Sequence, residues 1–329
     1  MELFRFLIKR AAHGVAVLFA IVTVLFSIRL IYPGDPATLI AAPDATEEVR
    51  AAVRADLGLD QPMYIQYFEY LSGLVQGDLG ISYQTGTAVA TQIATRLPAT
   101  IELAVAATVI SLALAIPFGV ISATNRNTRL DSVVTTLALV GVSTPNFWFG
   151  IILVLLFAVN IPFFPTGGRE FGFIESLGYL VFQGNLYAMV TWLSQMVLPA
   201  VTLGTYYTAL LTRLTRNGML EELGQLYIRA TRAKGLSETL VLYKHALRNS
   251  LAPLITILGL QVGRLVGGAV VIEEVFYWPG IGRLFINGVR NLDWPMVQGT
   301  LLLTAAAIVV ANIFVDISYT TLNPEVEYQ

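Results

Sequence analysis

Six long apolar stretches constrain this chain more than any other feature. Each is long enough, at 1.5 Å of helical rise per residue, to cross roughly 30 Å of hydrocarbon. They lie at residues 12–32, 99–123, 133–159, 190–212, 253–272 and 300–320. Hydrophobic residues make up 55% of the chain and charged residues only 13%, far below the roughly 25% typical of soluble domains. The sequence therefore predicts an all-α integral membrane protein with six transmembrane helices.

The distribution of lysine and arginine predicts the orientation of these helices, because cytoplasmic segments carry an excess of both. With a cytoplasmic N-terminus, twelve of the 20 Lys and Arg residues fall in the cytoplasmic segments and six in the much longer opposite segments. The apolar core of the first stretch, residues 11–28, is longer than that of a typical secretory signal, so we interpret it as an uncleaved anchor. Both termini are expected in the cytoplasm.

The stretches also predict how the chain is divided. The expected parts are a cytoplasmic N-terminus with the first span (1–32), an extracytoplasmic insertion (33–98), a core of five spans (99–320) and a cytoplasmic tail (321–329). Within the insertion, one amphipathic helix is predicted from Thr46 and Glu47 to a stop at Gly58, and another over residues 64–77. The insertion is expected to form a small helical cap rather than a catalytic domain.

Motifs for enzymatic chemistry are missing from the sequence. The chain has no cysteine, and its two histidines, His13 and His245, are too far apart to indicate a metal pair. It has neither a G-x-x-x-x-G-K-[ST] phosphate loop nor a G-x-S-x-G nucleophile. We therefore expect no catalytic residue, no metal or cofactor bound by this chain, no ATPase site of its own and no nucleic-acid partner.

A polar, basic segment at residues 212–252 separates the fourth and fifth stretches, and it holds seven of the Lys and Arg residues. It is too charged to enter a bilayer and too long for a tight turn. A helical pattern predicts a short helix before Gly235, a break at that glycine and a second helix running toward Pro253. Taken alone, the segment is equally compatible with a loop that rests on anionic lipid headgroups.

Polar residues inside the spans form a second group of candidates. In the fifth stretch, Gly259, Gly263 and Gly267 make a packing stripe, and Gln261, Arg264 and Gly268 fall roughly on the opposite side. Arg264 is expected near mid-membrane, where it lines a pathway, joins an internal ion pair or extends toward the membrane surface.

Three further positions bear on the shape of the spans. A kink is expected at Pro145, with Asn146 supplying partners for the freed backbone. Glu102 is expected to be solvated or to cap a helix end. Gln195 and Pro199 are expected to interrupt the fourth span.

Residues 227–256 resemble the cytoplasmic loop of the membrane permeases of binding-protein-dependent ABC importers, whose signature is E-A-A, then three intervening residues, then Gly. Arg229, Ala230, Thr231 and Gly235 occupy these four positions, with departures at the first and third. Further landmarks are similar to the dipeptide, oligopeptide and nickel permease branch. They are PGDPA (33–37), LGLDQP (57–62), GDLGIS (77–82), AKGLS (233–237), FYWPGIGRL (276–284) and LNPEV (322–326).

This resemblance implies a type I ABC importer permease fold in the plasma (inner) membrane of a bacterium or archaeon. It implies three kinds of partner besides the lipid bilayer: a second homologous permease, two ABC ATPase subunits that bind ATP and Mg, and an extracytoplasmic solute-binding protein. The 227–237 loop would couple to the ATPases through Arg229, Ala230, Thr231, Ala233, Lys234 and Gly235.

The transported solute stays open at this point. Peptides are the first expectation, with nickel chelates, glutathione and oligosaccharides as alternatives. A stand-alone secondary transporter or channel is the alternative of a different class. Such a protein would need inverted repeats, broken helices or buried ion-binding carboxylates, and none is convincing in this sequence.

Overall fold

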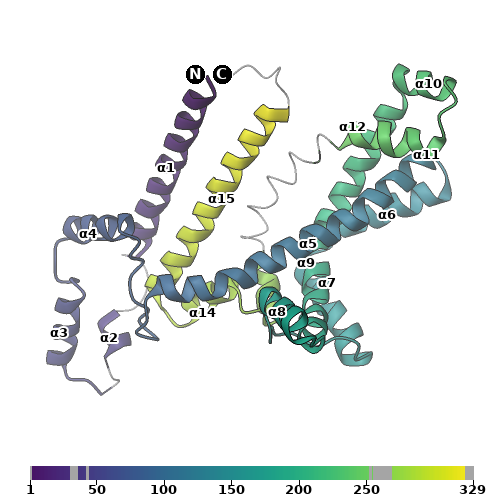
Figure 1. Cartoon of the computed structure of the whole chain (residues 1–329). Coiled ribbons are helices and arrows are strands. Elements are labelled where there is room, and N and C mark those ends of the chain that lie inside the picture. Colours follow the sequence, from purple (N-terminus) through teal and green to yellow (C-terminus); the bar gives the residue numbers. More distant parts are fainter. Residues whose placement is uncertain (1, 30–35, 42–43, 252–253, 255–268, 323–329) are drawn as a thin grey trace. The chain divides into compact units, whose positions relative to one another are not determined.

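The structure is a computed structural model that describes residues 2–29, 36–41, 44–251, 254 and 269–322 (Figure 1). These residues are helical or irregular, and one isolated antiparallel bridge joins Ile81 and Ala88. The chain divides into two units. The first contains Met1–Thr100 and Pro279–Val310, and the second contains Ile101–Trp278 and Ala311–Glu327. The all-α class predicted from the sequence is confirmed for the described residues.

The first unit is built from one long helix and several short ones. Its helices are α1 (Glu2–Arg29), α2 (Pro36–Ile40), α3 (Glu47–Asp56), α4 (Met63–Val75), the start of α5 (Val89–Thr124), α14 (Ile281–Arg290) and most of α15 (Trp294–Leu322). Helix α3 begins after Thr46, and Gly58 follows its end with a φ of +64°. Both amphipathic helices predicted in the insertion are therefore present, as α3 and α4.

Side-chain hydrogen bonds hold the irregular parts of the first unit. The carboxylate of Asp293 accepts from the Ser82 hydroxyl at 2.5 Å and from the Tyr83 backbone N–H at 3.1 Å. The Ile281 N–H at the start of α14 donates to the Thr100 hydroxyl at 2.8 Å. The GDLGIS motif (77–82) is thus fixed to a segment more than 200 residues away in the sequence.

The second unit contains the remaining helices. They are the rest of α5, α6 (Arg129–Ser143), α7 (Asn146–Val154), the π-helix η1 (Leu155–Asn160), α8 (Phe173–Gln183), α9 (Tyr187–Leu223), α10 (Leu226–Ala233), α11 (Glu238–Leu240), the π-helix η2 (Val241–Leu247) and α12 (Arg248–Ser250). Residues 269–275 are also helical. This unit carries the predicted basic segment.

Among the residues that the structure describes, four helices are long and apolar enough to cross a membrane: Ile8–Arg29 in α1, the whole of α5 and α9, and Trp294–Ile313 in α15. The pair of segments Arg129–Ser143 and Asn146–Asn160 makes a fifth candidate. The predicted stretch at 253–272 falls almost entirely outside the described residues. Five of the six predicted stretches thus coincide with helices, and the total of six spans stays a prediction.

The third stretch is not one kinked helix. Its two halves are bent by 104° between Ser143 and Asn146. Thr144 is extended, with a ψ of 127°, because the ring of Pro145 clashes with a helical residue before it. The expected kink at Pro145 is therefore a full break. In contrast, α9 continues without interruption through Pro199, so the interruption expected there was wrong.

Small residues let α5 and α9 approach closely. A Cβ added to Gly119 would lie 2.5 Å from the Cβ of Thr215, and one added to Gly204 would lie 2.8 Å from the Ser111 hydroxyl oxygen. That hydroxyl donates to the carbonyl oxygen of Gly204 at 3.0 Å. Such contacts between small residues are how helices associate in a bilayer, where lipid is as apolar as the side chains. Helices α5 and α9 therefore pack closely against each other within the second unit.

Candidate functional site

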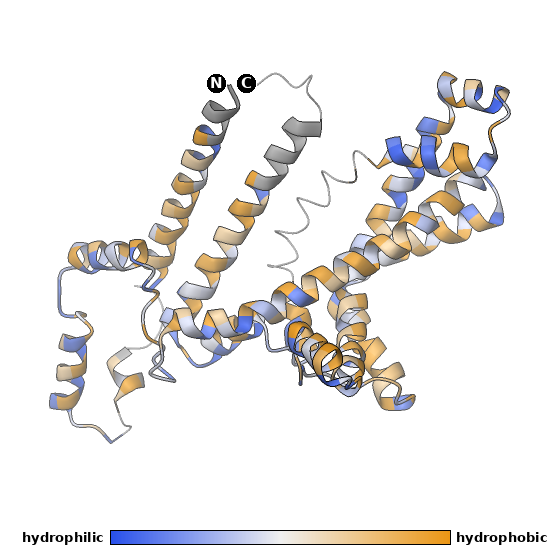
Figure 2. Cartoon of the chain, in the orientation of Figure 1, coloured by the Kyte–Doolittle hydropathy of each residue, from blue (hydrophilic) through white to orange (hydrophobic). Residues whose placement is uncertain are grey.

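The basic segment folds into a helical hairpin at the end of α9 (Figure 1). Helix α9 ends at Leu223, α10 covers Leu226–Ala233, and the chain then turns at Gly235 into α11, η2 and α12. The sequence prediction of a short helix, a break at Gly235 and a second helix is confirmed as far as Ser250. Figure 2 shows that hydrophilic residues are concentrated in this hairpin.

One side chain anchors α10 to the rest of the second unit. Ile228 is fully buried, and it packs in an apolar cluster with residues of α5, α9 and η2. The other buried members of that cluster are Val120, Ala123, Met219, Val241, Ala246 and Leu247. Ile228 is the single buried residue of this eight-residue helix. The hairpin is therefore attached to the long helices through an apolar base.

The opposite face of α10 is uncovered. Leu226, Arg229, Ala230 and Ala233 follow the i, i+3, i+4, i+7 spacing of one helical face, and all four are exposed. Leu226 is 79% exposed, although its side chain is large and apolar. The face thus combines one apolar residue, two small residues and a cation, a set that suits close contact with another protein surface.

Of the residues predicted from the signature, Arg229, Ala230, Ala233, Lys234 and Gly235 are exposed and Thr231 is partly buried. The Thr231 hydroxyl donates to the Ile228 carbonyl, within the helix. Gly235 has a φ of +77°, and a Cβ built there would meet no atom within 4 Å. The turn therefore depends on glycine for its backbone conformation and not for space.

Two polar contacts close the hairpin. Arg232 donates from Nε and Nη2 to Glu238 at 3.1 and 2.5 Å, across the Gly235 turn. This arginine holds the pKa of the Glu238 carboxyl below its ordinary value. The Tyr227 hydroxyl donates to Glu222 and accepts from the Asn249 amide at 2.9 Å. Burial and the bond to Glu222 raise the pKa of this hydroxyl.

A buried ion pair joins the helices next to the hairpin, and sequence reasoning missed it. Arg216 of α9 donates from Nε and Nη2 to the two carboxylate oxygens of Asp131 of α6, at 2.7 and 2.8 Å. The Ser122 hydroxyl and the Asn127 backbone N–H also donate to Asp131. A T-x-x-D capping pattern, formed by Thr128 and Asp131, was the available sequence signal for the position of this carboxylate.

A second ion pair joins α5 to the segment that precedes α8. Arg169 donates from Nε and Nη2 to Glu102 at 3.0 and 2.9 Å. The same carboxylate accepts from the backbone N–H of Phe173, the first residue of α8, and from the Trp192 indole. Glu102 thus caps the start of α8, whereas the sequence left open whether it is solvated or caps a helix end. Its pairing with Arg169 was not foreseen.

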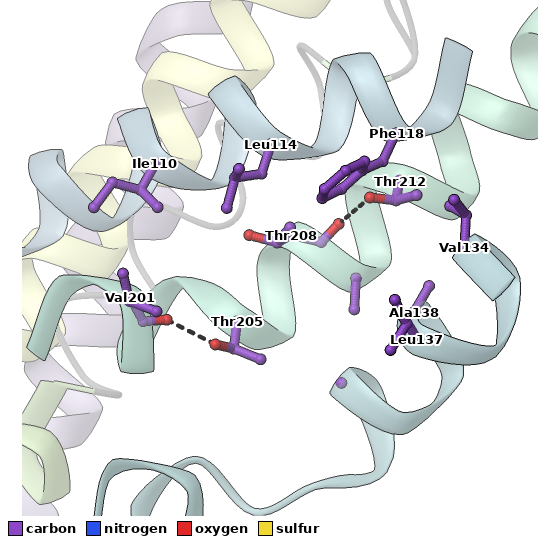
Figure 3. Close-up of a pocket in the computed structure, with 12 residues that line it drawn as sticks. Ile110, Leu114, Phe118, Val134, Leu137, Ala138, Val201, Thr205, Thr208 and Thr212 are labelled. Atoms are coloured by element: carbon purple, nitrogen blue, oxygen red, sulfur yellow. Dashed lines mark hydrogen bonds between the residues drawn. The ribbon is translucent and has the colours of Figure 1, made fainter. Parts of the chain in front are cut away.

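An apolar groove of about 160 Å³ lies between α5, α6 and α9 (Figure 3). Its lining includes Leu114, Phe118 and Leu137 together with three threonines of α9. The hydroxyls of these threonines, Thr205, Thr208 and Thr212, donate to the backbone carbonyls four residues earlier. Because these hydroxyls are already bonded within the helix, the groove offers few free polar groups. It fits an apolar occupant and not a polar solute.

The predicted pathway residues Gln261, Arg264 and Gly268 lie outside the described residues, as does the glycine stripe of the same stretch. Among the side chains that the structure describes, no group of three or more His, Cys, Asp or Glu is placed to hold a metal ion.

Comparison with known proteins identifies the chain. Residues 115–328 match the family described as binding-protein-dependent transport system inner membrane component, and residues 3–104 match the N-terminal family of the same membrane component. The chain belongs to this family. The hairpin therefore lies in a membrane component of a transport system that works with a separate binding protein.

Three relatives align with this chain over nearly its full length. The oligopeptide transport system permease protein AppB of Bacillus subtilis is 39% identical over 324 residues, covering 98% of this chain and 99% of the relative. The dipeptide permease protein DppB of Escherichia coli K12 is 37% identical over 336 residues, with 99% of each chain covered. The glutathione permease protein GsiC of the same organism is 37% identical over 324 residues, covering 98% and 99%. This chain is therefore a permease subunit of an ABC importer, and the resemblance seen in its motifs is confirmed.

Proposed function

We propose that this chain forms one half of the translocation pathway of an ATP-driven importer for peptides or a related small polar solute. The named relatives transport oligopeptides, dipeptides and glutathione, which supports a solute with a peptide backbone. Nickel chelates and oligosaccharides are the remaining alternatives. A separate solute-binding protein would select the solute, so ligand identification on that protein tests this part of the proposal.

The uncovered face of α10 is the surface through which we propose that the chain couples to an ATPase subunit. Residues 227–237 would lie against an ATPase subunit, with Ala230 and Ala233 allowing close approach and Arg229 and Lys234 presenting cations. Anchoring by Ile228 supports this role, because movement of α10 would be passed to α5, α9 and η2 through one apolar cluster.

The assembly would contain two different permeases, two ATPases that bind ATP and Mg, and one solute-binding protein. Six spans with both termini in the cytoplasm would place the hairpin on the ATPase side, and the positive-inside distribution supports this orientation. The chain would contribute no ATPase site. Purified alone it should hydrolyse no ATP, and native mass spectrometry of the complex should show one copy of this chain beside a second permease.

Substitution of Gly235 tests the coupling role. We expect Gly235→Asp to insert and assemble normally, because a Cβ built there meets no described atom within 4 Å and Asp is one of the few residues besides Gly that adopt a left-handed backbone. It should nevertheless uncouple ATP hydrolysis from uptake by placing a charged side chain between the turn and the ATPase. Gly235→Asn is the matched control, since Asn and Asp both tolerate a left-handed backbone. Normal uptake by Gly235→Asp at normal expression would contradict the assignment.

Gln261, Arg264 and Gly268 are proposed to line the pathway. A cation near mid-membrane would attract the carboxylate of a solute strongly, because charges interact more strongly in a low-dielectric channel than in water. Arg264→Ala should then slow uptake of solutes with a free carboxylate more than uptake of neutral analogues. If Arg264 is half of an internal ion pair instead, the same variant should fail to assemble.

A further inference from the structure

Helix α8 has an apolar stripe that no other described residue of the second unit covers. Ile174, Leu177, Val181 and Phe182 are exposed, at 82%, 40%, 65% and 87%. At 100° per residue they fall within one side of the helix, with Gly178 between them, where an added Cβ would meet nothing within 4 Å. A contiguous stripe of large apolar residues marks an interaction surface, unlike apolar residues that are exposed singly.

The other side of α8 is firmly attached, so the stripe is held in a fixed direction. Ser176 is fully buried, and its hydroxyl donates to the carbonyl of Ala188 in α9. At the start of the helix, Glu102 accepts from the Phe173 N–H at 3.0 Å, and Glu175 accepts from the Gly172 N–H at 3.3 Å. The helix ends at Gly184, whose φ is +63°.

Aromatic residues surround the attachment. The rings of Phe173 and Trp192 have centroids 5.0 Å apart, and Phe171 makes edge contacts with Tyr179 and Tyr187. Tyr and Trp concentrate where a membrane protein crosses from hydrocarbon to water. Tyr187 is also the first residue of α9, a candidate membrane span. This end of α9 therefore has the composition of a membrane interface.

Length and charge decide what covers the stripe. The 11 residues of α8 extend only about 16 Å, roughly half the hydrocarbon thickness, so the helix is too short to span. Residues 173–187 contain no Lys or Arg and one acidic residue, Glu175. A short amphipathic helix with a bare apolar face next to a span suits a position in the plane of the interface. In Figure 2, most of α8 has the orange colour of hydrophobic residues.

We propose that α8 is an interfacial helix that inserts Ile174, Leu177, Val181 and Phe182 among the lipid acyl chains beside the outer end of α9. The lipid is recognised by its hydrocarbon and not by its headgroup charge, since the helix offers no cation. Binding at this surface is independent of the transported solute and of the coupling hairpin.

Site-directed spin labelling tests this directly, because the natural chain has no cysteine. Single variants Ile174→Cys, Val181→Cys and Phe182→Cys are labelled with a nitroxide, and the transporter is assembled with cysteine-free partner subunits in phosphatidylcholine nanodiscs. Gln183→Cys, adjacent to Phe182 and on the opposite side of the helix, is the matched control. Collision with oxygen, which concentrates in hydrocarbon, is compared with collision with a water-soluble nickel chelate.

Labels on the stripe should collide several-fold more with oxygen than with the nickel chelate, and the label at residue 183 should show the reverse. Replacing part of the phosphatidylcholine with phosphatidylglycerol should change neither result. Equal nickel access at residues 182 and 183 would overturn the proposal. Protection that appears only after the solute-binding protein is added would also overturn it, because the stripe would then be a protein-docking surface.

Discussion

Helices α8 and α10 are both short and amphipathic, and each leaves one face uncovered, but the two faces differ in kind. The face of α10 combines Leu226 with Arg229, Ala230 and Ala233, whereas the face of α8 consists of large apolar side chains. Small residues and a cation suit a closely packed protein surface, and bulky hydrocarbon suits lipid. The composition of an uncovered face thus indicates the partner more directly than its mere exposure does.

The two helices also differ in how they are attached. Helix α8 is fixed by the Phe173 N–H bond to Glu102, by the Ser176 hydroxyl bond to the Ala188 carbonyl and by two aromatic contacts. Helix α10 depends on the single buried side chain of Ile228 and on two polar contacts at its ends. A helix that transmits movement should be attached at one strong point, and a membrane anchor at several. The following substitutions test that difference, beginning with the ion pair that joins α6 and α9 next to α10.

Breaking the Asp131–Arg216 pair should have the largest effect. Asp131→Ala would leave Arg216 without its partner in a site where Asp131 is only 7% exposed, and loss of one member of a buried pair costs about 3–5 kcal/mol. Thermal unfolding of the detergent-solubilised complex measures the loss. The double variant Asp131→Leu with Arg216→Met removes both charges and should recover most of the stability. Equal destabilisation by the single and double variants would contradict this account.

Truncating Ile228 should release α10 without unfolding the spans. Ile228→Ala removes a fully buried side chain, a change that costs about 2–5 kcal/mol in a packed core. Hydrogen exchange should rise across residues 226–235, while exchange in α5 and α9 stays low.

Leu226→Ala is the matched control on the exposed face of α10. It should change stability by less than about 0.5 kcal/mol and yet reduce coupled transport if that face docks on the ATPase. Unchanged transport by Leu226→Ala would weaken the distinction drawn between the two faces.

The Arg232–Glu238 contact should give the smallest effect, and it should depend on pH. The pKa of Glu238 is lowered in the folded hairpin, so the contact stabilises the turn above the unfolded-state pKa, and this stabilisation is lost as the pH falls through the lowered value. Both side chains are largely exposed, so the contribution is at most about 1 kcal/mol. A spin label at Ser237 should become more mobile on acidification, and Glu238→Gln should make it mobile at neutral pH. Mobility that stays constant from neutral pH to pH 3 would contradict this.

Predictions from the sequence succeeded where the signal was local. Apolar length marked five helical stretches that the structure describes, and Thr46, Gly58 and Gly235 marked helix ends correctly because capping and left-handed turns depend on a few neighbouring residues. Proline was harder to interpret. The same residue type bends the chain by 104° at Pro145 and leaves α9 continuous at Pro199, which is buried within that helix.

The sequence by itself determined that this is a helical membrane permease, since hydrophobic length, charge distribution and the motifs around Gly235 are properties of the chain as written. The tertiary structure decided which polar residues are paired. Asp131 meets Arg216 across 85 positions and Glu102 meets Arg169 across 67, and no periodicity encodes such distances. It also determined that Ile228 faces inward and Ile174 outward. The hydrophobic effect is non-directional, so it does not specify which neighbouring residue, or which solvent, covers an apolar face.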